Sequence, residues 1–335
     1  VIDKTPVKVT LSDSNLSGNT ALNLGGAIDH RSSGEFKVIN TTLSGNTAKN
    51  GGAIHTTRAI TIDGCEISSN SATSKGGAVY ATGTGAQVTV SGSSTFTENT
   101  ANLGGAVYIE LGKLSLNGAT FTSNSATENS EGKGGNGGAI VIAGGSLTAT
   151  GNNVFNSNTA VNHAGAVYVT NYEADDEAKT KTPSTASFTG ASFVQNNANY
   201  GGAVSVSADC VATFEDTSFT ENSSVNNGGA VYAYHAELQI NGGNTFSKNT
   251  TSSNGGAICL TGSKMTAQGA NTFSENNAVN HGGAIYVTYT NGENGKYGVL
   301  TMTDGKFTAK LVKIDRDLVL IPNVAAYFAA KGQEW

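Results

Sequence analysis

The sequence predicts an all-β fold, a right-handed parallel β-helix of about ten to eleven coils with three short strands per coil. Three observations predict it: a two-part motif that recurs ten times, a spacing of 27 residues between the last four copies, and a further apolar segment in each period. Short strands of this kind bury a continuous core only when successive coils stack. The segments alternate with period two and show no helical periodicity, and parallel crossovers favour the right hand.

The first part of the motif is an apolar residue followed three residues later by asparagine. We expect the apolar residue to point into the rod and to stack with its equivalents. We expect the asparagine to occupy a corner, to tolerate a left-handed backbone there, and to bond the asparagines above and below it. The first three copies carry Leu16, Leu43 and Ile67 in place of Phe, which predicts weaker packing at that end. The clearest copies are Phe96 with Asn99, Phe219 with Asn222, Phe246 with Asn249, and Phe273 with Asn276.

The second part of the motif is Gly-Gly-Ala followed by Ile or Val. Paired glycines predict a positive φ or a close backbone approach at the next corner. One copy departs from the pattern, because Ala164 stands in the place of the first glycine. In the clearest copies the pairs are Gly104 with Gly105, Gly228 with Gly229, Gly255 with Gly256, and Gly282 with Gly283.

The third segment of each period is an apolar pair five to eight residues before the Phe position, such as Val88 with Val90 and Leu114 with Leu116. Its alternation predicts the third strand of each coil.

A column of tyrosines lies in the strand after the glycines, at the position that alternation turns outward. We expect these side chains to face solvent and to form a flat aromatic strip. The strip has two interpretations: cross-strand stacking that stabilises the sheet, or a contact surface for a protein or a glycan. Its members are Tyr80, Tyr108, Tyr168, Tyr232 and Tyr286.

Two long insertions, residues 171–186 and 289–298, leave the corner after that strand. Insertions confined to one face of a solenoid often mark the binding side, so this edge is the best candidate functional surface. Tyr172, Asp175 and Asp176 belong to the first insertion. Its carboxylates raise the question of calcium, but no spacing resembles a calcium loop, and we expect a solvated run of charges and no metal. A third insertion, residues 128–136, leaves another corner.

Charge and cysteine content exclude several classes of function. The formal net charge is −6, so no basic surface is available for nucleic acid. No apolar run approaches the roughly 20 residues of a membrane-spanning helix. Cys65, Cys210 and Cys259 have unrelated spacings, which excludes a disulfide framework; we expect buried fillers, with an intermolecular bond as the alternative.

Catalytic residues are not recognisable in the sequence, and no cofactor is expected. Parallel β-helices include polysaccharide lyases and hydrolases, which need clustered carboxylates with a basic residue, or several aspartates on one face. The three arginines, Arg31, Arg58 and Arg316, lie far from the acidic insertion. His30 and His55 differ by one strand position and are expected to face opposite ways. We therefore expect no enzyme.

The motif stops after Phe307, which predicts two domains: a β-helix over residues 1–307 and a segment over residues 308–335. The second is either a cap with a short helix or a non-native tail. A cap would cover the open β-edge of the last coil.

The stretches FTENTANLGGAVYI, FTENSSVNNGGAVYA and FSENNAVNHGGAIYV resemble the polymorphic membrane proteins of chlamydiae, over about residues 10–300. The resemblance implies the passenger domain of an autotransporter, displayed on the outer membrane and attached to it only through a C-terminal barrel absent from this chain. It also implies an extracellular adhesin that binds a host-cell surface receptor protein or glycan. The alternatives are a structural surface repeat protein and, less favoured, a pectin-lyase-like enzyme acting on polysaccharide.

Overall fold

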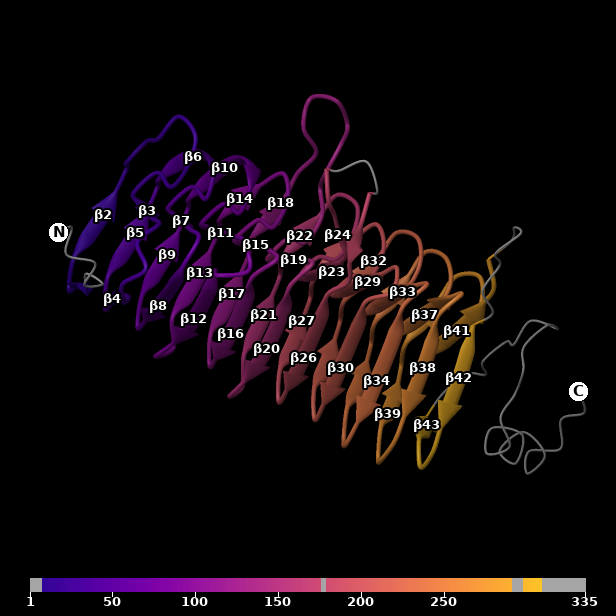
Figure 1. The fold of residues 1–335 in the computed structure, drawn as a ribbon. Coiled ribbons are helices and arrows are strands. Elements are labelled where there is room, and N and C mark those ends of the chain that lie inside the picture. The colour runs from indigo at the N-terminus through magenta and orange to yellow at the C-terminus, as the bar shows by residue number, and fades with distance from the viewer. Residues whose placement is uncertain (1–7, 176–178, 291–297, 309–335) are drawn as a thin grey trace, which may run out of the picture.

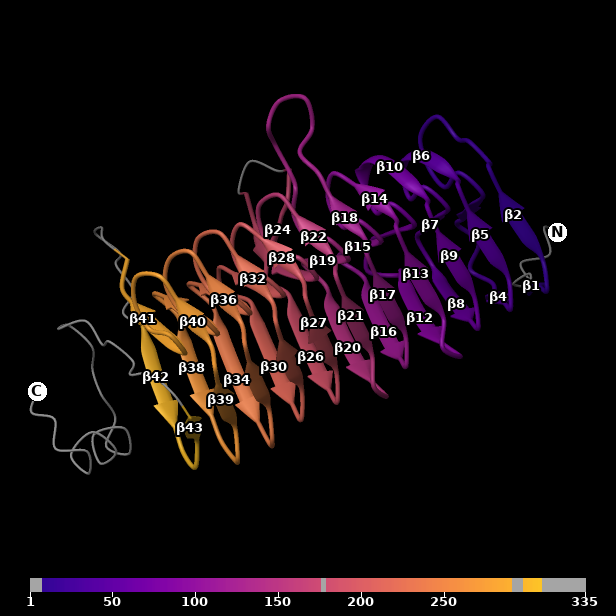
Figure 2. The same cartoon turned by 180° about the vertical axis from the view of Figure 1, so that it is seen from behind.

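The chain forms a rod-shaped parallel β-helix (Figure 1). The computed structural model describes residues 8–175, 179–290 and 298–308. Each coil passes in turn through four stacked sheets, here called A, B, C and D. The predicted fold class is confirmed, and Figure 2 shows the same stacking from behind. With coils about 4.8 Å apart, the rod is roughly 50 Å long.

Sheets A and B hold the two apolar strands that precede the ladder asparagine, joined by a tight corner. Sheet A consists of β1 (Val9–Ser12), β4 (Phe36–Ile39), β8 (Ala59–Asp63), β12 (Gln87–Ser91), β16 (Lys113–Asn117), β20 (Ser146–Thr150), β26 (Thr185–Thr189), β30 (Val211–Glu215), β34 (Glu237–Asn241), β38 (Lys264–Ala267) and β42 (Val299–Met302). Sheet B consists of β2 (Asn15–Ser17), β5 (Thr42–Ser44), β9 (Glu66–Ser68), β13 (Thr95–Thr97), β17 (Thr120–Thr122), β21 (Val154–Asn156), β27 (Ser192–Val194), β31 (Ser218–Thr220), β35 (Thr245–Ser247), β39 (Thr272–Ser274) and β43 (Lys306–Thr308).

Sheets C and D follow the ladder asparagine. Sheet C lies in the link between the two motif parts, which thus contains a short strand: β6 (Thr47–Asn50), β10 (Ser71–Lys75), β14 (Thr100–Ala101), β18 (Ser125–Ala126), β22 (Thr159–Ala160), β28 (Asn197–Ala198), β32 (Ser223–Ser224), β36 (Thr250–Thr251) and β40 (Asn277–Ala278). Sheet D follows the glycines: β3 (Ile28–His30), β7 (Ile54–Thr56), β11 (Val79–Thr82), β15 (Val107–Glu110), β19 (Ile140–Ala143), β23 (Val167–Thr170), β29 (Val204–Ser207), β33 (Val231–Tyr234), β37 (Ile258–Thr261) and β41 (Ile285–Thr288).

A column of stacked phenylalanine rings fills the core behind sheet B, as predicted. Neighbouring rings are nearly parallel, with centroids 4.7 Å apart between Phe219 and Phe246 and again between Phe246 and Phe273. Phe188 and Phe214 add a second stack from sheet A, at 5.4 Å. At the N-terminal end the column continues with smaller side chains, of which Leu16 is only partly buried.

The predicted asparagine ladder is present along the corner between sheets B and C. Asn222 donates its backbone N–H and its side-chain Nδ2 to Oδ1 of Asn249, each at 3.0 Å. The same Nδ2 also donates to the carbonyl oxygen of Phe193 in the preceding coil, at 2.9 Å. The ladder comprises Asn19, Asn46, Asn70, Asn99, Asn124, Asn158, Asn196, Asn222, Asn249 and Asn276.

The left-handed residue of this corner is not the asparagine, so that part of the prediction is wrong. The residue before each ladder asparagine has the positive φ, for example 56° at Glu221 and 55° at Lys248. The chain therefore turns at the residue before the asparagine, and the asparagine side chain points along the rod axis toward the asparagine of the next coil. Gly18 and Gly45 occupy the position in the first two coils, where φ is 68° and 62°.

The two motif glycines have different roles. The first adopts a positive φ, 70° at Gly228, and Ala164 takes the same conformation with φ 60°. The second glycine packs against the next coil: a Cβ added to Gly229 would lie 2.0 Å from the carbonyl oxygen of Gly256. The first position is also crowded, since a Cβ added to Gly228 would lie 2.2 Å from the Val231 carbonyl oxygen, but Ala164 shows that a coil can adjust to alanine there.

Small side chains line the remaining corners. Asn244 donates its Nδ2 to Oδ1 of Asn271 at 2.9 Å, which forms a second, shorter ladder between sheets A and B. Cys65 lies in that corner, and Cys210 lies in the corner between sheets D and A. All three cysteines are buried and free, which confirms their expected role as fillers.

Candidate functional site

The outer face of sheet D carries the predicted tyrosine column, with the expected register. Tyr80 pairs with Tyr108, and Tyr232 pairs with Cys259, which pairs with Tyr286. The prediction that these rings face solvent is wrong for three of them. Tyr80, Tyr108 and Tyr232 are only 7% to 8% exposed, and Tyr168 and Tyr286 are half-buried.

The column is covered because each link folds over the outer face of sheet D. The covering side chain comes from the residue just before the first motif glycine. Leu103 packs on the cluster around Tyr80 and Tyr108, and Lys75 Nζ lies 4.9 Å from the centroid of the Tyr108 ring. Lys75 also pairs with Glu110, which accepts a hydrogen bond from Tyr80 Oη at 3.3 Å. Burial raises the pKa of Tyr80 to about 12.

His163 covers the column farther along the rod, between three tyrosines. Its ring centroid lies 5.2 Å from that of Tyr168, 5.1 Å from that of Tyr200 and 6.3 Å from that of Tyr232, all nearly parallel. Burial lowers the pKa of His163 to about 4, so the imidazole is neutral at pH 7. These contacts favour the stabilising interpretation of the column.

The two insertions begin, as predicted, at the corner between sheet D and the next strand of sheet A, here called the D–A edge. In the first, β24 (Tyr172–Glu173) pairs antiparallel with β25 (Lys181–Thr182). Glu173 lies 3.7 Å from Lys181, and Asp175 lies 3.1 Å from Lys179. Each of these two carboxylates thus forms an exposed ion pair with a lysine of the same insertion. Asp176 lies outside the described residues, as do residues 291–297 of the second insertion.

The third insertion leaves the opposite edge of sheet D, after β18, and projects from the rod (Figure 1). Its base is held by asparagines of the neighbouring links. Asn102 Nδ2 donates to the carbonyl oxygens of Thr127 and Lys133, at 2.7 Å each. Asn162 Nδ2 donates to the carbonyl oxygen of Gly134 at 2.6 Å.

Two exposed tyrosines were not singled out from the sequence: Tyr234, and Tyr289 at the start of the second insertion. Their exposed fractions are 40% and 39%, and both lie on the D–A edge near the second insertion. Tyr234 ends β33, two residues after the buried Tyr232, and it therefore shares the outward side. The repeat period gave no signal for this exposure, because it depends on how far the covering link extends over sheet D.

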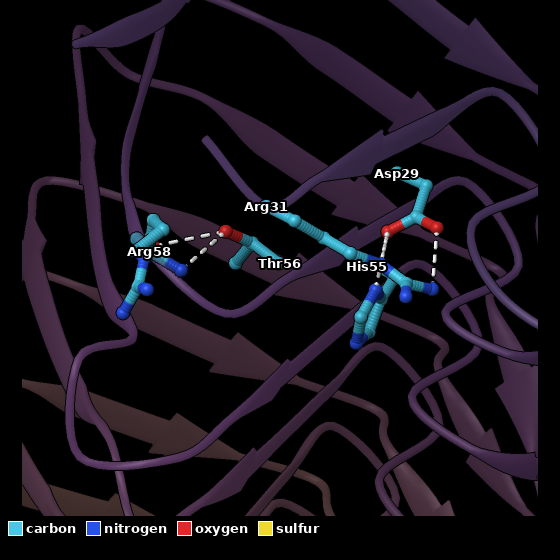
Figure 3. Close-up of polar contacts among 5 residues, drawn as sticks. All are labelled: Asp29, Arg31, His55, Thr56 and Arg58. Carbon is cyan, nitrogen blue, oxygen red and sulfur yellow. Dashed lines mark hydrogen bonds and ion pairs between the residues drawn. The ribbon is translucent and has the colours of Figure 1, made fainter. Parts of the chain in front are cut away.

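Polar residues also meet at the N-terminal end of sheet D (Figure 3). Asp29 Oδ1 lies 2.6 Å from His55 Nδ1, and Asp29 Oδ2 accepts a hydrogen bond from Arg31 Nη2 at 2.8 Å. Burial works to raise the pKa of Asp29, but the bonds from Arg31 and His55 outweigh it and lower the pKa. His30 points inward against Phe36, so the predicted opposite directions of His30 and His55 are confirmed.

Metal-binding clusters and membrane-spanning helices are absent from the described ranges. Within residues 8–175, 179–290 and 298–308, no three metal-ligating side chains come together. The same part of the chain contains no apolar helix of membrane-spanning length. The segment after residue 308, with its predicted short helix, lies outside the described residues.

The repeat of this chain matches that of a known family. Six segments match the Chlamydia polymorphic membrane protein repeat: residues 40–57, 64–82, 93–110, 216–234, 245–261 and 272–288. No curated protein sequence matches the chain significantly. A similar solved structure is the catalytic unit of a thermostable GH87 alpha-1,3-glucanase from Streptomyces thermodiastaticus strain HF3-3, with a TM-score of 0.42 and 13% identity, covering 90% of this chain and 64% of that one. This likeness is too distant to bear on activity.

Fold and motif together define a parallel β-helix repeat protein, in which the asparagine ladder and the glycine pair recur from coil to coil, with Ala164 replacing one glycine. The chain carries six copies of the Chlamydia polymorphic membrane protein repeat, which supports the family that the resemblance of its motifs indicated. The repeat implies a surface protein with a passenger-like β-helix.

Proposed function

We propose that the chain is a cell-surface adhesin, the passenger domain of an autotransporter, which binds a protein or glycan of the host-cell surface without catalysis. The observation that carries the proposal is the D–A edge. Two long insertions leave this edge, and Tyr234 and Tyr289 are exposed along it. Loops and exposed aromatic residues on a rigid scaffold are the usual elements of recognition.

The rest of the rod supports this placement. The Phe column, the asparagine ladder and the glycine pairs make contacts between coils inside the rod, so they are not accessible to a partner. The tyrosine column that contains Tyr108 lies under the links. The length of the D–A corner, by contrast, differs from coil to coil, because two of the three insertions leave it. A net charge of −6 disfavours nucleic acid as a partner.

A non-catalytic role fits the local chemistry. The Asp29 carboxylate contacts both Arg31 and His55, so it is engaged in an ion pair, and among the described residues no nucleophile is hydrogen-bonded to that pair. Glu173 and Asp175 of the first insertion pair with lysines. A purely structural surface repeat is the alternative, and a polysaccharide-active enzyme is the less favoured one.

The test is attachment of the purified chain to cultured epithelial cells. We expect saturable binding above the level of an albumin control, with no release of reducing or unsaturated sugar from a polysaccharide panel. Binding no greater than albumin would favour the structural alternative. Release of sugar would favour the enzyme.

A further inference from the structure

A group of side chains at the D–A edge, here called the edge aromatic cluster, bridges two coils that are not adjacent. It consists of Tyr234, His235, Tyr289 and Thr290. The rings of Tyr234 and His235 stack with centroids 4.3 Å apart and an interplanar angle of 7°. His235 Nε2 lies 3.0 Å from Thr290 Oγ1, although 55 residues separate them. The chain after β41 thus reaches back to β33.

The backbone explains why two sequential side chains stack. In a strand they would point to opposite faces, but His235 has a φ of 52°, which turns the chain so that its ring lies against Tyr234. In the coil between them the same corner position is Gly262, which has no side chain and a φ of 56°. A left-handed non-glycine residue costs free energy, and the stacking of His235 on Tyr234 helps to offset that cost.

The surroundings of Tyr234 are short, neutral and polar. Ser207 and Thr261 are its register partners in the neighbouring strands of sheet D. The N–H of the exposed Asp209 donates to the His235 carbonyl oxygen at 2.9 Å, which places an acidic residue at the adjoining corner. A partly exposed ring therefore stands beside hydroxyl groups, with a carboxylate nearby.

We infer that the edge aromatic cluster is a stacking platform for a neutral sugar ring of a glycan. The apolar face of a pyranose packs on an exposed aromatic ring, and its hydroxyl groups exchange hydrogen bonds with neutral hydroxyl side chains. Stacking by His235 holds the Tyr234 ring in place before binding, which reduces the entropic cost. The nearby carboxylate disfavours sulfated and sialylated glycans. The inference rests on the proposed adhesin function and specifies its ligand class.

Three variants test the inference on an array holding lactose, maltotetraose and chitotetraose as neutral probes and heparin as an anionic one. Tyr234→Ala removes the platform. His235→Gly removes the stacked ring but relieves the backbone, as Gly262 does one coil farther on. Leu111→Gly is the matched control, because Leu111 is left-handed at the same corner four coils away, with a φ of 62°.

We expect the parent chain to bind at least one neutral probe. Binding should fall about tenfold or more in Tyr234→Ala and His235→Gly, as loss of one stacking contact implies, and should be unchanged in Leu111→Gly. His235→Gly should keep or raise the thermal midpoint, which a merely structural role would not allow. Absence of neutral-probe binding, preference for heparin, or equal binding by Tyr234→Ala would each overturn the inference.

Attachment to deglycosylated epithelial cells separates this inference from the proposed function. Undiminished attachment of the parent chain to such cells, without binding to the neutral probes, would point to a protein receptor. That result would contradict the glycan as ligand but would leave the proposed adhesin function intact. Failure to attach to any cell would overturn the adhesin itself.

Discussion

Asn222 and Asn249 are joined by two hydrogen bonds of 3.0 Å that end on one carboxamide oxygen, and Asn196 makes the same pair of bonds to Asn222. Each ladder asparagine therefore satisfies the backbone and side chain of one neighbour and the oxygen of the other. Because the amide groups of these asparagines are buried, they need hydrogen-bond partners within the protein, and coils can stack only where the ladder provides them.

Replacing Asn222 with alanine is expected to destabilise the rod by about 3 kcal/mol, because it removes the acceptor of the Asn196 N–H and one acceptor of the Asn196 side-chain Nδ2, together with a donor to the Phe193 carbonyl oxygen. Denaturant unfolding measures the change. Asn197→Ala is the control, since Asn197 Nδ2 bonds the partly exposed Ser223, and it should change the free energy of unfolding by less than about 0.5 kcal/mol. Equal midpoints for Asn222→Ala and the parent chain would refute the ladder.

The two motif glycines should respond differently to alanine. Gly229→Ala places a methyl group against the Gly256 carbonyl oxygen and is expected to prevent folding or cost several kcal/mol. Gly228→Ala places a Cβ 2.2 Å from the Val231 carbonyl oxygen and should also destabilise. Its cost should be lower than that of Gly229→Ala, because Ala164 shows that a coil can adjust at the equivalent position. Thermal unfolding of the two variants, Gly228→Ala and Gly229→Ala, measures the difference in their stabilities. If Gly229→Ala were the more stable variant, the close approach of Gly229 to the carbonyl oxygen of Gly256 in the next coil would be contradicted.

Glycine before a ladder asparagine is expected to stabilise the rod. Glu221 has a φ of 56°, and Gly45 shows that glycine fits the same corner. Glu221→Gly should therefore raise the free energy of unfolding by up to about 1 kcal/mol. The control is Glu215→Gly at the end of β30, where the backbone is extended and glycine should destabilise. A loss of stability in Glu221→Gly would contradict the corner geometry.

Stability should depend on pH through His163. Its folded pKa, lowered by burial to about 4, lies below the unfolded value of 6.5. The unfolded chain therefore binds more protons between pH 6.5 and pH 4, so stability falls as pH falls across that window and this dependence ends below it. The loss is about 2–3 kcal/mol. His163→Leu, which copies Leu103 at the same link position, should flatten the pH dependence of the unfolding free energy in that window. An unaltered slope would exclude His163 as the source of the pH dependence.

The repeat spacing was sufficient to predict the coils, the Phe column and the partners of each ladder asparagine, because those features recur in every period. It placed the left-handed residue one position late, at Asn222 rather than Glu221, since both lie within the same polar corner. Alternation correctly turned Tyr108 outward. It could not reveal that Leu103 and Lys75 cover that side, because coverage depends on how the link folds between coils.

The candidate site could be predicted only in part for the same reason, because the period does not show where the links lie. The insertions were visible as breaks in the repeat, and their common edge followed from the strand that precedes them. The exposure of Tyr234 and Tyr289 was not predictable from period alone, since it depends on where each link ends over sheet D. The predicted boundary at residues 307 and 308 stays a prediction.

Recognition at the D–A edge is the central claim, and cell attachment of edge variants tests it most directly. One variant shortens residues 171–186 to a four-residue turn, a second carries Tyr234→Ser with Tyr289→Ser, and the control shortens residues 128–136 on the opposite edge of sheet D. With folding verified by circular dichroism, flow cytometry should show attachment reduced about tenfold in at least one edge variant and unchanged in the control. Full attachment by both edge variants, or a loss confined to the control, would contradict the account.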